Sequence, residues 1–266
     1  MLFSSMIFLW CFLPVVLLGS FLLRAKFRNW FLLAASLIFY AWGEPGYIWL
    51  MLISIAVNYL CGLLVDRTTG IWKKFMLALD VAANLGLLGY FKYANFFVDT
   101  VNGLNPGTIR GFEQIALPIG ISFYTFQAMS YVIDVYRRDC RVQKNPGLLG
   151  LYITCFPQLI AGPIVKYHDV AAQLENRNCS VMDFSCGIRR FVYGLTKKVL
   201  IANPLAAVAD GVFGIASEHL GTGIAWLGAI CYTLQIYYDF SGYSDMAIGL
   251  GACSGSGSRK TSIIRI

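Results

Sequence analysis

The amino-acid sequence predicts an all-α, polytopic membrane protein, and three observations lead to that prediction. Of the 266 residues, 58% are hydrophobic and only 13% are charged, whereas about 25% are charged in an average soluble domain. Several apolar runs approach the length of about 20 residues that lets a helix cross a hydrocarbon core of about 30 Å. Basic residues gather in the short loops between these runs, as is typical of loops on the cytoplasmic side.

Five spans are expected in the first half, at residues 3–23, 30–42, 47–65, 76–93 and 117–135. Pro14 is expected to kink the first span. The second span is short and needs its flanks to cross the bilayer. A turn at Gly43-Glu44-Pro45-Gly46 then leads into the third span.

Ten of the 21 basic residues follow the first, third and fifth of these spans. This alternation places the N-terminus outside the cell, because loops rich in Lys and Arg stay in the cytoplasm. The clustering also indicates a lipid bilayer rather than nucleic acid as the partner of a chain with a net charge of +7. The ten residues are Arg24, Lys26, Arg28, Arg67, Lys73, Lys74, Arg137, Arg138, Arg141 and Lys144.

The second half is expected to complete a total of about seven to eight membrane segments. Residues 148–164 are apolar but broken by Pro157 and Gly162-Pro163, and such breaks belong where protein or a cavity surrounds them. Residues 184–212 are amphipathic and too charged for a simple span, so an interfacial helix is expected. Residues 224–250 form a long last span with a polar second half.

The cysteines do not indicate a metal site or a disulfide framework. The eight cysteines are scattered, none forms a CxxC pair, and most lie in apolar runs. A free cysteine in such a run behaves as a small hydrophobic residue. We therefore expect neither a bound metal nor a bound cofactor.

Two stretches in the middle of the chain place polar groups at membrane depth, where such groups usually line a cavity or pair with one another. Gln127, Ser130 and Asp134 are spaced i, i+3 and i+7 and share one helix face. Gln158 follows Pro157 in the second stretch. His168 could serve as a general base, but a lone histidine beside a charged loop is more typical of the interface, and His219 resembles a loop residue. Interhelical hydrogen bonding without chemistry remains the alternative for Gln127, Ser130 and Asp134.

A third polar stretch, "LQIYYDFSGYSDMAIGLG", lies at residues 234–251. If it is helical, Gln235, Tyr238, Asp239 and Asp245 fall within an arc of about 120°. Gly242 lies between the two carboxylates, where it allows a close approach or breaks the helix. Two carboxylates at low dielectric need a shared proton or a basic partner. This stretch is therefore either the wall of a polar tunnel or a structural pairing with Arg or Lys of another helix. Asp80 and Asn84, an i, i+4 pair, are expected to act in packing.

At these stretches the chain resembles the membrane-bound O-acyltransferases. The motifs are "LPIGISFYTFQAMSYVIDVYRR", "CFPQLIAGPIVKY" and "YYDFSGYSDMAIGLG". "MLFSSMIFLWCFLPVVLLG", "LIFYAWGEP" and "NLGLLGYFKYANFF" resemble the alginate O-acetyltransferase branch in particular, and the likeness covers residues 1–251 as a single membrane domain. Asp239, Ser241 and Gly242 lead into Tyr243, Ser244 and Asp245, which stand where the family has its Tyr-Ser-Asp motif.

The resemblance implies a bacterial enzyme of the cytoplasmic membrane that passes an acyl group to hydroxyls of an exported polysaccharide such as alginate. It implies an acyl donor, acetyl-CoA or an acyl carrier, as co-substrate, and extracytoplasmic proteins of polysaccharide acetylation as partners. The residues expected to line a tunnel or contact substrate are Gln127, Asp134, Gln158, Gln235, Asp239, Tyr243, Ser244 and Asp245. A transporter or flippase, or a non-catalytic membrane subunit, remains the alternative.

The resemblance also implies a catalytic histidine in an Arg-Trp-His segment after "DFSGYSD", and these 266 residues hold no such segment. We therefore assign no catalytic residue. Codons can be chosen for residues 252–266 that, read in a shifted frame, continue the family pattern. The hypothesis is a one-base slip near Gly251, a disordered tail over 252–266, and a truncated chain that is inactive alone. The rival is a short family member with a linker tail.

Overall fold

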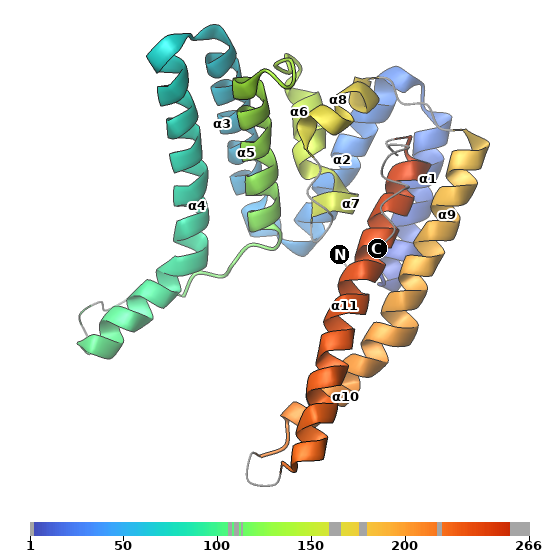
Figure 1. Ribbon diagram of the computed structural model, residues 1–266. Helices are drawn as coiled ribbons and strands as arrows, with labels where there is room; N and C mark the ends of the chain where they lie inside the picture. Colours follow the sequence, from blue (N-terminus) through green and yellow to red (C-terminus); the bar gives the residue numbers. More distant parts are fainter. Residues whose placement is uncertain are drawn as a thin grey trace. The chain divides into compact units, whose positions relative to one another are not determined.

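The computed structural model describes residues 3–105, 108, 112, 114–159, 166–175, 180–216 and 220–255. Within these ranges the chain is all-helical, as predicted, and no residue lies in a strand (Figure 1). The chain divides into two compact units. Among the described residues, the first unit comprises residues 3–28, 175, 180–216 and 220–255, and the second comprises residues 29–105, 108, 112, 114–159 and 166–174.

The second unit is built around three long helices, α3 (Ile48–Arg67), α4 (Gly70–Leu104) and α5 (Ile121–Arg137), which pack against one another. Helix α2 (Ala25–Gly43) and a 3₁₀ turn, η2 (Pro45–Tyr47), precede them. Three short helices follow: α6 (Pro146–Thr154), α7 (Phe156–Leu159) and α8 (Tyr167–Glu175).

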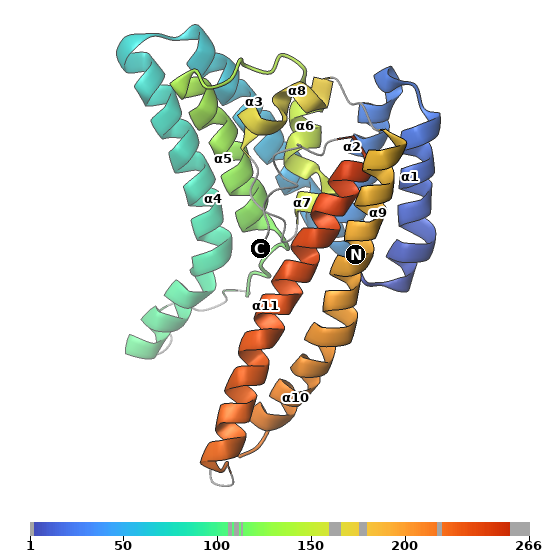
Figure 2. The same ribbon diagram turned by 45° about the vertical axis from the view of Figure 1, so that its right-hand side comes forward.

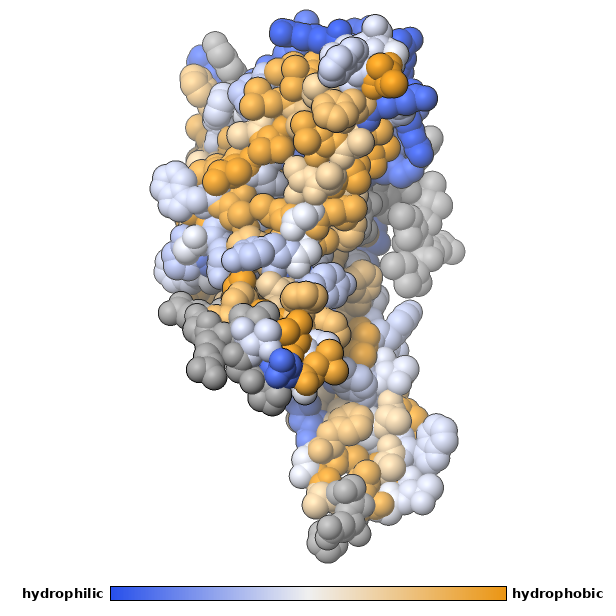
Figure 3. All heavy atoms as spheres, turned by 90° about the vertical axis from the view of Figure 1, so that its left-hand side faces the viewer, coloured by the Kyte–Doolittle hydropathy of each residue, from blue (hydrophilic) through white to orange (hydrophobic). Residues whose placement is uncertain are grey.

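Two segments of the second unit are long and apolar enough to cross a membrane, Pro45–Arg67 and Gly70–Leu104. Helix α4 is 35 residues long, so the span expected at residues 76–93 is only its middle part. Its outward face exposes large apolar side chains, among them Phe75, Leu79 and Phe96. Figure 3 views this face and shows apolar residues over most of it, with hydrophilic residues at the end where α4 begins. This surface suits contact with lipid.

The helix boundaries refine the expected spans. The short span at residues 30–42 belongs to a 19-residue helix, α2, so its flanks do extend it. The break expected within residues 148–164 is present, because α6 ends at Thr154 and α7 starts at Phe156. The Gly162-Pro163 pair lies outside the described residues.

The first unit starts with a π-helical turn, η1 (Phe8–Phe12), which leads directly into α1 (Leu13–Leu22). Pro14, the expected kink, is the second residue of α1 and directly follows the π-helical turn, where the helical hydrogen-bond pattern changes. The rest of the unit is a helical pair. One partner runs through α9 (Val181–Thr196), a π-helical segment η3 (Lys197–Ala202) and α10 (Asn203–Phe213); the other is α11 (Thr222–Cys253).

Helices α9 and α10 lie along α11 in both views (Figures 1 and 2). Gly194 and Gly242 allow the two backbones to touch: a Cβ atom on Gly194 would lie 2.5 Å from the carbonyl oxygen of Gly242. Small residues at such crossings are typical of helix pairs in membranes. Helix α11 is continuous through Gly242, so this glycine serves close approach and does not break the helix. Helix α11 ends at Cys253, and residues 256–266 of the expected tail lie outside the described residues.

Candidate functional site

The sequence-predicted polar residues form two groups, one in each unit. Gln127, Asp134 and Gln158 lie in the second unit and belong to a network that joins α5 to α6, α7 and α8. The other five lie on α11 in the first unit, and two of them, Asp239 and Asp245, pair with basic residues of the facing helix. The eight candidates therefore comprise two sites, each described by itself.

The second-unit network starts at the break between α6 and α7. Because the chain leaves the helix at Cys155, the N–H group of Phe156 donates to Ser36 Oγ at 3.3 Å and not to the preceding turn. The carbonyl oxygen of Tyr152 accepts a hydrogen bond from Gln127 Nε2 at 2.7 Å. The same Nε2 also donates to Gln158 Oε1 at 3.2 Å. A buried carbonyl without a donor is costly, so Gln127 stabilises the broken helix.

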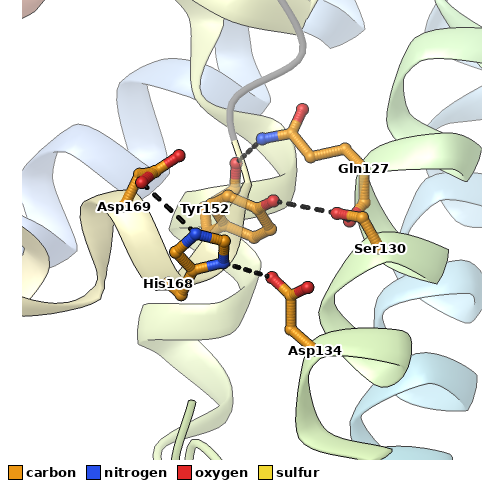
Figure 4. A network of polar contacts seen from close by, with 6 residues as sticks. All are labelled: Gln127, Ser130, Asp134, Tyr152, His168 and Asp169. Carbon is orange, nitrogen blue, oxygen red and sulfur yellow. Dashed lines mark hydrogen bonds and ion pairs between the residues drawn. The ribbon is translucent and has the colours of Figure 1, made fainter. Parts of the chain in front are cut away.

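The same face of α5 carries Ser130 and Asp134 (Figure 4). Ser130 Oγ lies 3.3 Å from the hydroxyl of Tyr152. Asp134 is buried, and its Oδ2 lies 3.1 Å from Nδ1 of His168 at the start of α8. The predicted i, i+3, i+7 face of α5 is therefore confirmed as a polar face directed at its neighbours.

His168 lies between two carboxylates, Asp134 on one ring nitrogen and Asp169 on the other. The distance from Nε2 to Asp169 Oδ1 is 3.4 Å. The histidine side chain is 35% exposed and that of Asp169 is 59% exposed, whereas Asp134 is only 7% exposed. A buried carboxylate of this kind fixes the orientation of the imidazole ring that it contacts.

The pairing of Asp134 with His168 was not predicted from the sequence. The two residues are 34 positions apart, and no periodicity connects them. Nearby, burial, together with the charges of Asp134 and Asp139, raises the pKa of the Cys140 thiol to about 12. Cys140 is therefore a neutral thiol at physiological pH.

The first-unit group is a charge cluster between α9–η3 and α11. Arg190 Nε donates to Asp245 Oδ1 at 3.0 Å, and Lys197 Nζ donates to Asp245 Oδ2 at 2.7 Å. Lys197 also donates to Ser241 Oγ at 3.0 Å. Lys198 pairs with Asp239. Both carboxylates thus have a basic partner on another helix, which is the structural alternative that the sequence left open.

The charges of the amphipathic stretch at residues 184–212 are used in this pairing. Arg190 and Lys197 are seven residues apart and so lie on one face. Lys198 follows directly, at the start of the π-helical segment η3, and also reaches α11. Segments of π-helix occur frequently at functional sites. The basic residues that make this stretch too charged for a simple span therefore face carboxylates.

The other three α11 candidates are partly or wholly enclosed. Tyr243 is buried, and its ring stacks on that of Phe3 with centroids 4.7 Å apart. Ser244 is buried as well. The Oε1 atom of Gln235 is inaccessible to solvent and has no hydrogen-bond donor within the described part of the chain. A buried amide oxygen without a donor is unusual and marks a place for a polar group.

Three further residues that the sequence singled out are Asp80, Asn84 and His219. Asp80 and Asn84 are buried, and Asn84 exchanges hydrogen bonds with Asn58 of α3 at 3.1 and 3.2 Å, as expected for a packing role. His219 lies outside the described residues. Among the residues that are described, no group of three or more His, Cys, Asp or Glu side chains is placed to hold a metal ion.

Comparison with known proteins identifies relatives over nearly the whole chain. No protein-family model matches it. It is 46% identical to the probable alginate O-acetylase AlgI of Pseudomonas syringae pv. tomato, over 96% of this chain and 50% of that protein. Identity is 45% to the AlgI of Pseudomonas aeruginosa, with the same coverage. It is 36% to the peptidoglycan O-acetyltransferase of Helicobacter pylori, over 94% of this chain and 54% of that protein.

The chain therefore spans about half the length of the curated relatives that it matches. The motifs of α5 and α11 on which the resemblance was predicted lie within the described residues, whereas residues 160–165 of the α7 motif lie outside them. The predicted resemblance is confirmed: over nearly its whole length, this chain is similar to about half of an alginate-type O-acetylase of the membrane-bound O-acyltransferase family.

Proposed function

We propose that the chain forms a membrane-embedded part of an O-acetyltransferase that passes acetyl groups across the membrane to hydroxyls of an exported polysaccharide. The observation that carries this proposal is the 45–46% identity, over 96% of the chain, to proteins named as probable alginate O-acetylases. A more distant relative is named for peptidoglycan. The relatives thus share acetyl transfer to oxygen and differ in the glycan, so alginate is the first acceptor to test.

The proposed setting is the bacterial cytoplasmic membrane, with about seven to eight membrane segments and the N-terminus outside. Two long apolar helical segments and the exposed apolar face of α4 support a membrane location. The basic loops after the first, third and fifth expected spans support the orientation. Partner proteins outside the membrane would complete transfer to the polysaccharide.

In the proposed reaction, the oxygen of an acceptor hydroxyl attacks the carbonyl carbon of an acetyl thioester. The C–S bond breaks, and a base takes the hydroxyl proton and passes it to the leaving thiolate, which departs as the thiol. Acetyl-CoA or an acyl carrier would serve as donor. We assign no catalytic base among the described residues, because the family resemblance places that histidine in a segment that these 266 residues do not contain.

The proposed role of the eight candidate residues is to support and line two polar sites, one within each unit. Gln127 and Gln158 hold the broken α6–α7 segment in place, and Asp134 fixes α8 through His168. Asp239 and Asp245 join α11 to α9 and η3. Gln235 has a free buried acceptor, and with Tyr243 and Ser244 it is the part of α11 best suited to contact substrate.

The test is acetyl transfer in membranes of a strain that lacks its own alginate O-acetylase. One sample carries the 266-residue chain alone, and a second carries the chain joined to the remaining half of the P. aeruginosa relative. With a radiolabelled acetyl donor and alginate, we expect ester formation only in the second sample. If the joined protein is stably inserted but transfers no acetyl group, the proposed function is wrong. If the chain alone transfers acetyl groups, the need for the remaining half is wrong.

A further inference from the structure

One end of the second unit concentrates positive charge. Helix α4 starts beside the end of α5, because Lys73 Nζ donates to the carbonyl oxygen of Tyr136 at 2.8 Å. The loop after α5 lies against α3, because the hydroxyl of Tyr59 donates to the carbonyl oxygen of Lys144 at 2.8 Å. Eight basic residues share this end, and we call them the basic rim: Arg67, Lys73, Lys74, Arg137, Arg138, Arg141, Lys144 and Lys166.

The basic rim is not neutralised by the protein. All of its members except Lys73 are exposed. The exposed carboxylates of the same loops and helix ends are Asp66, Asp139 and Asp169, which leaves a surplus of five positive charges. Within the ranges that the structure describes, no rim residue forms an ion pair. Apart from Lys73, the rim therefore presents unpaired cationic groups at the hydrophilic end of the face in Figure 3.

Arg138 stands out from the other rim residues by its backbone. It has a φ of 66°, and no other residue except glycine has a positive φ in the described ranges. The residue closes α5 in a Schellman motif: its N–H group donates to the carbonyl oxygen of Val135 at 3.2 Å, and that of Asp139 donates to the carbonyl oxygen of Asp134 at 3.0 Å. Glycine is the usual residue at this position because a Cβ atom is crowded there.

An arginine strains the backbone at a position that favours glycine. The orientation of the chain in a membrane does not require an arginine at this particular position. A positive charge at any neighbouring loop position would serve the orientation equally well. Backbone strain of this kind tends to persist where a side chain is needed for function. The guanidinium of Arg138 has no hydrogen-bond or ion-pair partner within the described part of the chain, so its planar set of donors is available to a ligand.

We propose that the basic rim, centred on Arg138, is a binding site for phosphate groups. A guanidinium matches phosphate with two parallel hydrogen bonds, and neighbouring lysines and arginines add attraction. Two sources offer this chemistry: the headgroups of anionic phospholipids, and the phosphates of a soluble acyl donor. The second source rests on the proposed function. The first requires only that the chain lie in a membrane with anionic lipids.

The test measures phosphate binding without acetyl transfer, so its failure is distinct from failure of the proposed function. The purified chain is placed in nanodiscs of phosphatidylcholine, and retention of radiolabelled coenzyme A is measured. A second set contains phosphatidylglycerol, and native mass spectrometry counts the anionic lipids retained. The variants Arg138→Gly and Arg138→Asn both suit the left-handed backbone and remove the charge. Arg138→Lys keeps the charge without the planar fork.

The matched control is Lys92→Gln. It removes one exposed charge from α4, the helix that carries Lys73 and Lys74 of the rim, about 27 Å beyond Lys74 at 1.5 Å per residue. We expect Arg138→Gly and Arg138→Asn to weaken binding about fivefold to tenfold, with the thermal stability unchanged or raised. Arg138→Lys should be intermediate, and Lys92→Gln should bind as the parent does. If the Arg138 variants lose only coenzyme A binding, the phosphate comes from the soluble donor. If they lose only anionic-lipid binding, the phosphate comes from the membrane.

Two results would overturn the proposal. One is unchanged binding of both probes by folded Arg138→Gly and Arg138→Asn chains. The other is an equal loss in the Lys92→Gln control, which would show that total charge, and not this end of the second unit, determines binding.

Discussion

The two carboxylates of α11 differ in how much they should contribute to stability, and the structure allows the difference to be worked out. Asp245 accepts from both Arg190 and Lys197, and its side chain is 19% exposed. Asp239 has one partner, Lys198, and is 49% exposed. Removing one member of a buried ion pair costs about 3–5 kcal/mol, whereas exposed pairs contribute about 0–1 kcal/mol.

The change Asp245→Asn keeps the side-chain volume but leaves two partly buried cations without a counter-charge. Because Arg190 and Lys197 are 25% and 32% exposed, water offsets part of the loss, and we expect a cost of about 2–4 kcal/mol. Asp239→Asn is the matched control, with an expected cost below about 1 kcal/mol. At about 2–4 °C per kcal/mol for a chain of this size, Asp245→Asn should lower Tm by roughly 4–16 °C.

The assay is thermal unfolding of the detergent-purified chain, followed by tryptophan fluorescence and by circular dichroism. A double variant tests the cause, because Arg190→Gln removes one of the two stranded cations. Added to Asp245→Asn, it should recover part of the lost Tm, as a positive coupling energy in the double-mutant cycle. The reasoning is refuted if Asp245→Asn is no more destabilising than Asp239→Asn, or if Arg190→Gln recovers nothing.

Three further outcomes are expected. Gly194→Val should separate α9 from α11 and lower the free energy of unfolding by about 1–3 kcal/mol, because its Cβ would lie 2.5 Å from the Gly242 carbonyl oxygen. Gly211→Val, with open space around it, is the control for changes at a helical glycine. Equal Tm losses in the two variants would contradict the packing argument. Gln127→Leu should cost about 1–3 kcal/mol in denaturant unfolding because it leaves the Tyr152 carbonyl oxygen without its Gln127 donor, and an unchanged midpoint would count against that hydrogen bond. The raised pKa of Cys140, about 12, means that its thiol stays protonated as the pH rises. Iodoacetamide labelling of Cys140 in the folded chain, read by peptide mass spectrometry, should therefore remain slow from pH 7 to 10, whereas in the denatured chain the labelling rate should increase near the usual thiol pKa of about 8.5. An increase in the labelling rate of the folded chain at that pH would contradict the prediction and show an accessible thiol.

The helical class and the main segments follow from the sequence because they depend on local properties. Apolar runs of membrane-spanning length and their basic ends can be counted residue by residue. The polar face of α5 was also predictable, since Gln127 and Asp134 are two helical turns apart. The lengths of α2 and α4 could not be predicted from the sequence, because both helices extend through polar and basic residues that a hydropathy criterion leaves out of a membrane span.

Partners across helices depend on packing that periodicity does not encode. The sequence left Asp239 and Asp245 either as a tunnel wall or as structural pairs, and it took the approach of α9 and η3 to bring Arg190, Lys197 and Lys198 to them. It also treated His168 as an interfacial histidine, whereas α8 brings it to Asp134.

By itself, then, the sequence determined the helical class, the polar faces and the family resemblance, since each is a pattern along a single segment. Only the tertiary structure decided which charges neutralise one another, that the break after Thr154 is stabilised by Gln127, and that Arg138 occupies a left-handed position in the basic rim. The physical reason is that ion pairs, freed carbonyl groups and backbone strain arise from contacts between segments distant in the chain, and from the turn geometry that those contacts impose.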